Sequence, residues 1–272
     1  MFETYILPIL IFAVLGCIAG VLLTVASKVF AVKADERLDA VNEVLPQINC
    51  GACGYSGCGD YASAIIDGAP TNQCKAGGNE TAKRLSEIMG VTAIDVEQQV
   101  AVIHCSGDCN ATTSKYIFSG TQSCAAANRF YSGSEVCTHG CLGFGDCMTV
   151  CPNGAIYIND NIAHINKSKC IGCGLCTKTC PNKLITVKSI THYVDVACSS
   201  TDMGKVTKDI CKKGCIGCKI CEKKCPVGAV TVGNNLAHID YEKCTSCGEC
   251  AKACPTGAIV NCNIQITENP AE

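Results

Sequence analysis

The chain has 272 residues, of which 27 are cysteine and none is tryptophan, and only 5% are aromatic. So few large apolar side chains exclude an ordinary hydrophobic core for a chain of this length, and we expect metal–sulfur groups to organise the cysteine-rich part. The formal net charge is −2, and we expect no nucleic-acid partner.

A long apolar segment opens the chain. Residues 4–27 carry no charge and are mostly aliphatic; as a helix they span roughly 36 Å, enough to cross a bilayer. A cleaved signal peptide fits less well, because Glu3 is the only charge before a run that is too long for one. We therefore expect a single-pass anchor in membrane lipid over residues 1–33. By the positive-inside rule the rest of the chain is expected on the cytoplasmic side, since three basic residues follow the segment: Lys28, Lys33 and Arg37.

A small helical domain is expected at residues 34–99. Helical spacing covers 34–45, 60–67 and 80–89. A CxxCxxxxC motif with neighbouring glycines lies between the first two of these segments, and a zinc knuckle would require a second CxxC pair. We expect the motif and a cysteine downstream to bind one 4Fe–4S cluster, through Cys50, Cys53, Cys58 and Cys74.

An internal repeat follows a connecting segment at 100–136. From Cys137 the cysteines recur with an offset of 74 residues, so that Cys137 corresponds to Cys211 and Cys151 to Cys225. Each repeat contains two cysteine runs that end in Cys-Pro, the signature of bacterial ferredoxins with two clusters. We expect an α+β fold with two ferredoxin modules, each made of two short hairpins and two short helices. They cover residues 137–197 and 198–262, and a tail follows at 263–272.

The cysteine runs also predict which thiolates share a cluster. In two-cluster ferredoxins, three cysteines spaced two residues apart hold one cubane, and the cysteine before the proline reaches over to the other. Three sets follow from this pattern: Cys151, Cys170, Cys173 and Cys176; Cys215, Cys218, Cys221 and Cys254; and Cys225, Cys244, Cys247 and Cys250.

One run departs from the pattern. Phe144 stands where the repeat offset places Cys218, so the first run of the first repeat lacks one thiolate. Cys137 is the nearest replacement, although its counterpart Cys211 is surplus in the second repeat. We therefore expect the fourth set to comprise Cys137, Cys141, Cys147 and Cys180.

Five 4Fe–4S clusters use 20 of the 27 cysteines. Cys17 lies in the apolar segment, where we expect it to pack. For the six other cysteines two alternatives stay open: they are buried structural thiols, or they are ligands of a sixth cluster. These six are Cys105, Cys109, Cys124, Cys198, Cys211 and Cys262. A disulfide scaffold or a set of zinc sites fits less well, because triple spacing followed by Cys-Pro is typical of cubane ligands.

Four features in the same order give the chain a family resemblance. They are the apolar amino-terminal segment, the stretch CGACGYSGCGDYASAI with Cys74-Lys-Ala-Gly-Gly after it, the run from Cys137 to Cys147, and the ferredoxin repeats. Over essentially its whole length the chain resembles the B subunits of the Rnf complex, the membrane-bound ferredoxin:NAD oxidoreductase that couples electron transfer to sodium or proton export. The resemblance implies an electron relay from soluble ferredoxin to the membrane and flavoprotein subunits, with nicotinamide reduced in a different subunit.

Consistent with a relay, the sequence contains no phosphate-binding loop and no nucleophile–base pair. A lysine-rich stretch of the second repeat is expected to dock acidic ferredoxin; it holds Lys205, Lys208, Lys212, Lys213, Lys219, Lys223 and Lys224. Two other functions are a tethered polyferredoxin that serves a hydrogenase or another dehydrogenase, and a metal-stabilised adaptor without redox work. The motif at Cys50 favours the relay over the polyferredoxin, and absorption that bleaches with dithionite would exclude the adaptor.

Overall fold

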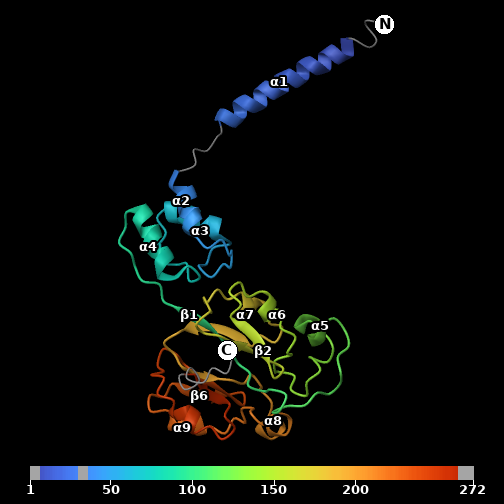
Figure 1. Cartoon of the computed structure of the whole chain (residues 1–272), viewed down its shortest axis with the longest axis vertical. Coiled ribbons are helices and arrows are strands. Elements are labelled where there is room, and N and C mark those ends of the chain that lie inside the picture. Colours follow the sequence, from blue (N-terminus) through green and yellow to red (C-terminus); the bar gives the residue numbers. More distant parts are fainter. Residues whose placement is uncertain (1–6, 30–35, 263–272) are drawn as a thin grey trace.

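The computed structural model describes residues 7–29 and 36–262 (Figure 1). A long helix stands at one end, a small helical domain follows it, and two ferredoxin-like modules lie side by side at the other end. Thr4, Lys33 and the predicted tail at 263–272 lie outside the described residues.

The first helix, α1, Leu7–Val29, is long and apolar enough to cross a membrane. Its 23 residues extend about 34 Å, against about 30 Å for the hydrocarbon core of a bilayer. Its described apolar side chains are exposed along the helix, with Phe12 75% exposed, and no other part of the described chain covers them. A surface of this kind is unfavourable in water and requires a cover that the described chain does not provide.

Three helices surround the amino-terminal cysteine motif: α2, Glu36–Val44, α3, Cys58–Ile66, and α4, Gly78–Met89. Each lies within about two residues of its predicted bounds, so these helix predictions are confirmed. Their shared core contains Val41, Tyr61 and Leu85, which are at most 1% exposed. The Tyr61 hydroxyl donates to the Pro70 carbonyl at 2.8 Å, which holds the loop after α3 against this core.

Each module contains one hairpin, one further strand pair and two short helices that carry cysteines. Module 1 consists of β1, Gln99–Ile103; α6, Asp146–Thr149; β2, Ile156–Asn159; β3, Ile162–Ile165; α7, Leu175–Thr179; and β4, Ile185–Ser189. Module 2 consists of β5, Val194–Val196; α9, Ile220–Lys224; β6, Val230–Gly233; β7, Leu236–Ile239; α10, Glu249–Lys252; and β8, Ile259–Asn261. Two further helices precede the cysteine runs: α5, Cys124–Asn128, and α8, Gly204–Ile210.

The strand pairs differ from the predicted module boundaries. β1 pairs antiparallel with β4, from Gln99↔Ser189 to Ile103↔Ile185, although it lies before the predicted start of the first module at 137. Likewise β5 pairs with β8, although it precedes the predicted start of the second module. Each module therefore has one hairpin and one pair of its first and last strands, where we expected two hairpins. A tight turn marks a hairpin in the sequence, whereas pairing between distant strands leaves no local signal.

The two hairpins, β2–β3 and β6–β7, turn in the same way. Asp160 and Asn161 have φ of 47° and 64°, and Asn234 and Asn235, at the matching places of the repeat, have φ of 49° and 63°. Positive φ at both central residues is the type I′ turn, which suits Asn and Asp and matches the twist of paired strands. The structural repeat thus follows the 74-residue offset of the sequence.

The predicted connecting segment is an insertion within module 1. Residues 104–136 join the first strand to the cysteine runs there, whereas only residues 197–210 do so in module 2. The longer segment contains α5 and reaches module 2, where Thr112 Oγ1 donates to the Ile210 carbonyl at 2.9 Å. It therefore helps to hold the two modules together.

Candidate iron–sulfur centres

The amino-terminal motif lines a cavity beside α3. The structure brings together all four cysteines predicted for it: Cys50, Cys53, Cys58 and Cys74. Asn49 Oδ1 accepts the Cys58 backbone N–H at 2.8 Å, and the Gly77 N–H donates to Cys74 Sγ at 3.3 Å. Burial raises the pKa of the Cys74 thiol. A positive group such as iron beside the sulfur favours loss of its proton.

Module 1 has two cysteine-lined cavities. The first brings together one predicted set: Cys151, Cys170, Cys173 and Cys176. The Ala155 N–H donates to Cys151 Sγ at 3.2 Å, and the Ala101 N–H donates to Cys170 Sγ at 3.4 Å. Because Ala101 lies in β1, a strand outside the predicted module contributes directly to this site.

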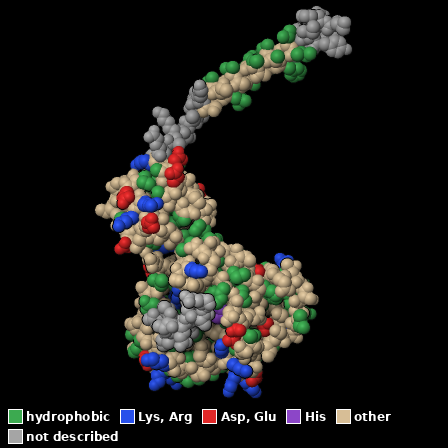
Figure 2. All heavy atoms as spheres, viewed as in Figure 1, with side chains coloured by type: hydrophobic (Ala, Val, Ile, Leu, Met, Phe, Trp, Pro, Cys, Tyr) green, Lys and Arg blue, Asp and Glu red, His purple; other side chains and the backbone are tan. Residues whose placement is uncertain are grey.

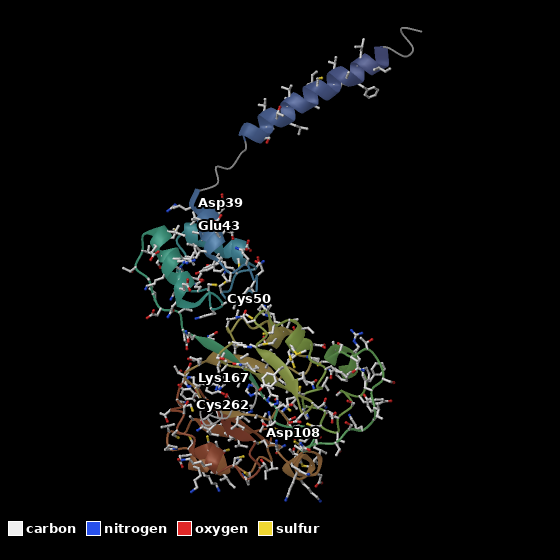
Figure 3. The ribbon with its side chains drawn as sticks, viewed as in Figure 1. Asp39, Glu43, Cys50, Asp108, Lys167 and Cys262 are labelled. Atoms are coloured by element: carbon white, nitrogen blue, oxygen red, sulfur yellow. The ribbon has the colours of Figure 1, made fainter. Side chains whose placement is uncertain are left out.

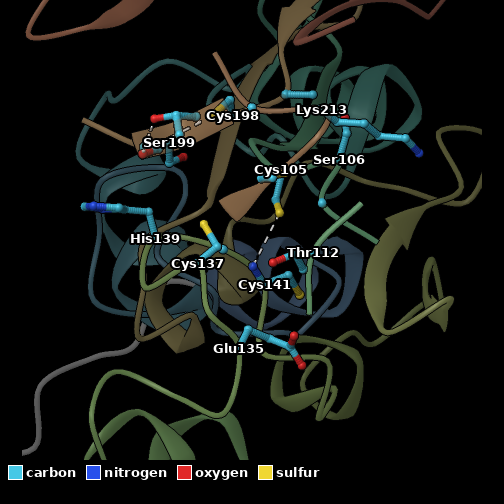
Figure 4. Close-up of a pocket in the computed structure, with 17 residues that line it drawn as sticks. Cys105, Ser106, Thr112, Glu135, Cys137, His139, Cys141, Cys198, Ser199 and Lys213 are labelled. Carbon is cyan, nitrogen blue, oxygen red and sulfur yellow. Dashed lines mark hydrogen bonds between the residues drawn. The ribbon is translucent and has the colours of Figure 1, made fainter. Parts of the chain in front are cut away.

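The second cavity of module 1 differs from the prediction in one cysteine. Cys141, Cys147 and Cys180 line it as expected, but the fourth cysteine is Cys124. Cys137, which we expected there, lines a different cavity between the two modules (Figure 4). No spacing rule links Cys124 to the run that contains Cys141. The only indication in the sequence was that this run lacked one thiolate while other cysteines had no assigned site.

Asp146 holds Cys124 in this position. Its carboxylate accepts the backbone N–H groups of Cys124 at 2.9 Å and Ala125 at 3.0 Å, and the Ser123 hydroxyl at 2.9 Å. Although burial acts to raise it, these hydrogen bonds lower the pKa of Asp146. The start of α5 is thus fixed to the start of α6, which carries Cys147.

Phe144, which stands in place of the missing cysteine, packs against the insertion. Its ring meets the edge of the Phe118 ring at a centroid distance of 5.6 Å, and Phe118 also contacts Phe130 at 6.0 Å. The same inserted segment therefore supplies both the replacement thiol and the apolar cover for the substituted position.

Module 2 repeats the two sites of module 1. One cavity brings together a predicted set: Cys215, Cys218, Cys221 and Cys254. At the second site, burial raises the pKa of Cys250 to about 11, and the nearby thiolates of Cys244 and Cys225 contribute to this increase. These three predicted ligands therefore lie close together. Cys218 and Cys247 are exposed, so both sites approach the surface of the protein.

The donor chemistry of these sites fits 4Fe–4S clusters. All 27 cysteines lie in the described part of the chain, and none forms a disulfide there. Four thiols around a cavity can bind the corners of a cubane. Burial, and then neighbouring thiolates, raise the pKa of Cys147 to about 12, so a positive cluster is needed to keep such thiols ionised.

The amino-terminal site adjoins the first cavity of module 1. Lys178 Nζ, on α7, donates to the Cys50 carbonyl at 3.0 Å. The Cys50 thiolate also contributes, after burial, to the raised pKa of Cys173. Cys50 lies on the side of its domain that faces the modules (Figure 3). The two sites are therefore neighbours although their motifs are far apart in the sequence.

Family models match the regions that form these sites. One described as "Putative Fe-S cluster" matches residues 45–76. Two described as "4Fe-4S dicluster domain" match residues 131–196 and, in two segments, 169–229 and 214–258. The chain therefore contains several ferredoxin-like 4Fe–4S domains.

Three curated relatives, each the B subunit of its complex, cover most of the chain. The relative from the "Ion-translocating oxidoreductase complex" of Methanosarcina acetivorans is 41% identical over 90% of the chain and 93% of its own length. The relative from the "Na(+)-translocating ferredoxin:NAD(+) oxidoreductase complex" of Acetobacterium woodii is 38% identical over 90% of the chain and 74% of its own length. The relative from the "Proton-translocating ferredoxin:NAD(+) oxidoreductase complex" of Clostridium ljungdahlii is 38% identical over 89% and 86%. These relatives confirm the resemblance that the motifs indicate, and the chain belongs to the family of B subunits of the Rnf complex, an ion-translocating oxidoreductase.

Proposed function

We propose that this chain is the membrane-anchored electron-transfer subunit of an Rnf-type complex, which accepts electrons from reduced ferredoxin and passes them to membrane and flavoprotein subunits. The observation that carries the proposal is the series of cysteine-lined cavities between the exposed thiols of module 2 and the site at Cys50. A bound 4Fe–4S cluster supplies a one-electron redox centre. The chain itself supplies the thiolates, the N–H donors that tune them, and the spacing between neighbouring sites.

Five ligand sets belong to this proposal, one of them revised by Cys124. They are Cys50, Cys53, Cys58 and Cys74; Cys151, Cys170, Cys173 and Cys176; Cys124, Cys141, Cys147 and Cys180; Cys215, Cys218, Cys221 and Cys254; and Cys225, Cys244, Cys247 and Cys250.

Matching backbone donors support a common design in the two modules. The Ala155 N–H donates to Cys151 Sγ and the Ala229 N–H donates to Cys225 Sγ, both at 3.2 Å. N–H groups directed at ligand sulfur stabilise the added negative charge of the reduced state and raise the reduction potential. Each of these two cysteines is the Cys of a Cys-Pro pair that ends a cysteine run, so we assign them the same role in their modules.

We place the ferredoxin contact on module 2. All seven lysines of the predicted stretch are exposed, and basic side chains gather at the end of the molecule farthest from α1 (Figure 2). Lys213 forms an ion pair with Asp108 of the insertion, so we assign docking to the other six, which we call the lysine surface: Lys205, Lys208, Lys212, Lys219, Lys223 and Lys224. Because exposed Cys218 and Cys247 lie in the same module, an acidic protein docked there is close to two sites.

We also propose that α1 crosses the membrane and that the modules lie on the cytoplasmic side. The length and the uncovered apolar surface of α1 support the first statement, and the basic residues after it support the second. A chain that begins at Ala34 is expected to leave the membrane fraction while it keeps its iron. Its retention in washed membranes would point to anchoring through partner subunits instead.

The deciding experiment purifies the full chain anaerobically from detergent-solubilised membranes. We expect it to copurify with flavoprotein membrane subunits, and we expect its visible absorption to bleach on addition of reduced ferredoxin. Copurification with a hydrogenase would favour the tethered polyferredoxin. If the absorption does not change even when dithionite is added, the result would favour the metal-stabilised adaptor, which does no redox work.

A further inference from the structure

Four cysteines that belong to none of the five sets meet in a cavity between the modules (Figure 4). Cys105 and Cys137 come from module 1, and Cys198 and Cys211 come from module 2. With the open solvent at its mouth included, the space around these cysteines is about 450 Å³, against about 320–410 Å³ for the four other cysteine-lined cavities. It is thus of the same order as the cavities of the other cysteine sets.

Cys105 and Cys198 occupy equivalent positions. Cys105 lies two residues after the end of β1, and Cys198 lies two residues after the end of β5. Each sulfur accepts a backbone N–H from the cysteine that opens the following run: Cys141 donates to Cys105 Sγ at 3.4 Å, and Cys215 donates to Cys198 Sγ at 3.2 Å. The same contact thus holds both sulfurs at the cavity.

Cys137 and Cys211 are also equivalent. They are related by the 74-residue offset, and each carbonyl accepts an N–H from a glycine three residues later, Gly140 at 3.4 Å and Gly214 at 3.2 Å. Each module therefore contributes the same two-cysteine half to the lining of the cavity.

Two glycines that line the cavity, Gly107 and Gly140, show where three of its sulfur atoms lie. A Cβ added to Gly107 would lie 3.3 Å from Cys211 Sγ and 3.7 Å from Cys105 Sγ, so these two sulfurs flank one point. A Cβ added to Gly140, which also lines the cavity, would lie 3.5 Å from Cys137 Sγ, so this sulfur faces the same space.

Two simpler explanations account for less of the geometry. The four thiols form no disulfide. Zinc sites usually combine closely spaced pairs of ligands, whereas these four cysteines come from four separate places in the chain. Buried structural thiols would not require both modules to direct two equivalent cysteines at one cavity. Four thiols from two related halves are instead a complete ligand set for a cubane.

We propose that a sixth 4Fe–4S cluster lies between the modules, bound by Cys105, Cys137, Cys198 and Cys211. Each thiol gives up its proton as its sulfur binds iron. The proposal rests on the proposed relay and supplies its missing connection. Cys141 lines both this cavity and the cavity of Cys124, while Cys215, a ligand of module 2, contacts Cys198. A cluster held there would lie between the sites of module 2 and the Cys124 site of module 1.

The first test counts iron and acid-labile sulfide in the full, anaerobically reconstituted chain. Six cubanes predict about 24 irons per chain, and five predict about 20. A count near 20 in a fully loaded chain would overturn the interface site and leave the relay untouched. A count near 24 with no reduction by ferredoxin would support the site and overturn the relay.

The second test uses matched cysteine variants. Cys211→Ser and Cys198→Ser are each expected to lose about four irons and the same component of the Mössbauer spectrum. Cys109→Ser, at an exposed cysteine of the insertion, is expected to lose none. Full iron content in both of the first two variants would overturn the proposal. If neither variant folds, the iron count of the unmodified chain decides.

Discussion

Lys188 Nζ lies 2.5 Å from Asp195 Oδ1, and this ion pair joins the last strand of module 1 to the first strand of module 2. The two side chains are only 5% and 1% exposed. Asp195 also accepts the Tyr241 hydroxyl at 2.7 Å, and Lys188 Nζ lies 4.7 Å from the centre of the Tyr241 ring. The contact between the modules therefore contains a buried charge pair that has several partners.

Replacing Lys188 by methionine is expected to destabilise the protein by about 3–5 kcal/mol, because Asp195 then keeps a buried charge without its partner. The urea midpoint, followed by circular dichroism under anaerobic conditions, measures the loss. The double variant Lys188→Met/Asp195→Asn retains an acceptor for Tyr241 without a buried charge, and we expect it to recover most of the stability. An unchanged midpoint for the single variant would contradict this role.

Replacing Cys124 by serine is expected to remove about four irons per chain, because three thiolates remain at its site. Cys109→Ser is the matched control, since Cys109 lies in the same insertion but is exposed. Iron and labile sulfide analysis of both variants, prepared side by side, makes the comparison. If Cys124→Ser keeps all of its iron, the site returns to the set with Cys137 that the spacing predicted.

Asp146→Asn preserves the size of the side chain but exchanges an accepting oxygen for a donor. We expect the hydrogen bonds at the start of α5 to weaken by about 1–3 kcal/mol, so that Cys124 is held less firmly. The measurement is the rate at which a chelator removes iron from the protein. We expect one kinetic phase of this iron loss, the phase of the Cys124 site, to become faster. Asp160→Asn, at the exposed turn of the first hairpin, provides the control, and equal rates in the two variants would argue against Asp146 as a positioning residue.

Reversing the charge of Lys223 and Lys224 is expected to slow reduction by ferredoxin by about tenfold or more at low salt and to flatten its dependence on ionic strength. Stopped-flow absorbance measures the bimolecular rate. The control reverses Lys83 and Lys169, which are exposed outside module 2. Reduction by dithionite should be equal in all variants. A wild-type rate and salt dependence for Lys223→Glu/Lys224→Glu would place the docking site elsewhere.

Alanine substitutions at Gly172 and Gly154 separate two effects, steric overlap with β1 and backbone strain. Both have positive φ, 65° and 56°, but a Cβ at Gly172 would lie 2.6 Å from the Gln99 carbonyl oxygen, whereas Gly154 has open space. Alanine at either position costs about 1–2 kcal/mol in backbone conformation. We expect only Gly172→Ala to displace β1 and to increase iron loss from the neighbouring site. Similar iron loss in both variants would show that the backbone conformation alone determines the effect.

The sequence predicted those features that depend on local spacing. The helices of the amino-terminal domain follow from apolar periodicity and Pro46, and the runs that end at Pro152 and Pro255 fix which cysteines lie close together. Cys124 could not be predicted because its approach to Cys147 depends on the fold of a long insertion and on the Asp146 carboxylate. The pairing of β1 with β4 was missed for a similar reason, since nothing in either strand specifies a distant partner.

The pairing of β1 with β4 also determines where the chain can be divided into folding fragments. A fragment that begins at Cys137 leaves the inner edge of β4 without its partner and removes the Ala101 N–H from Cys170. A bare strand edge beside an iron site is open to pairing with a second copy, which favours aggregation during expression. A fragment that begins before Gln99 and ends before Val194 retains both strands, but it loses Asp195, the partner of Lys188.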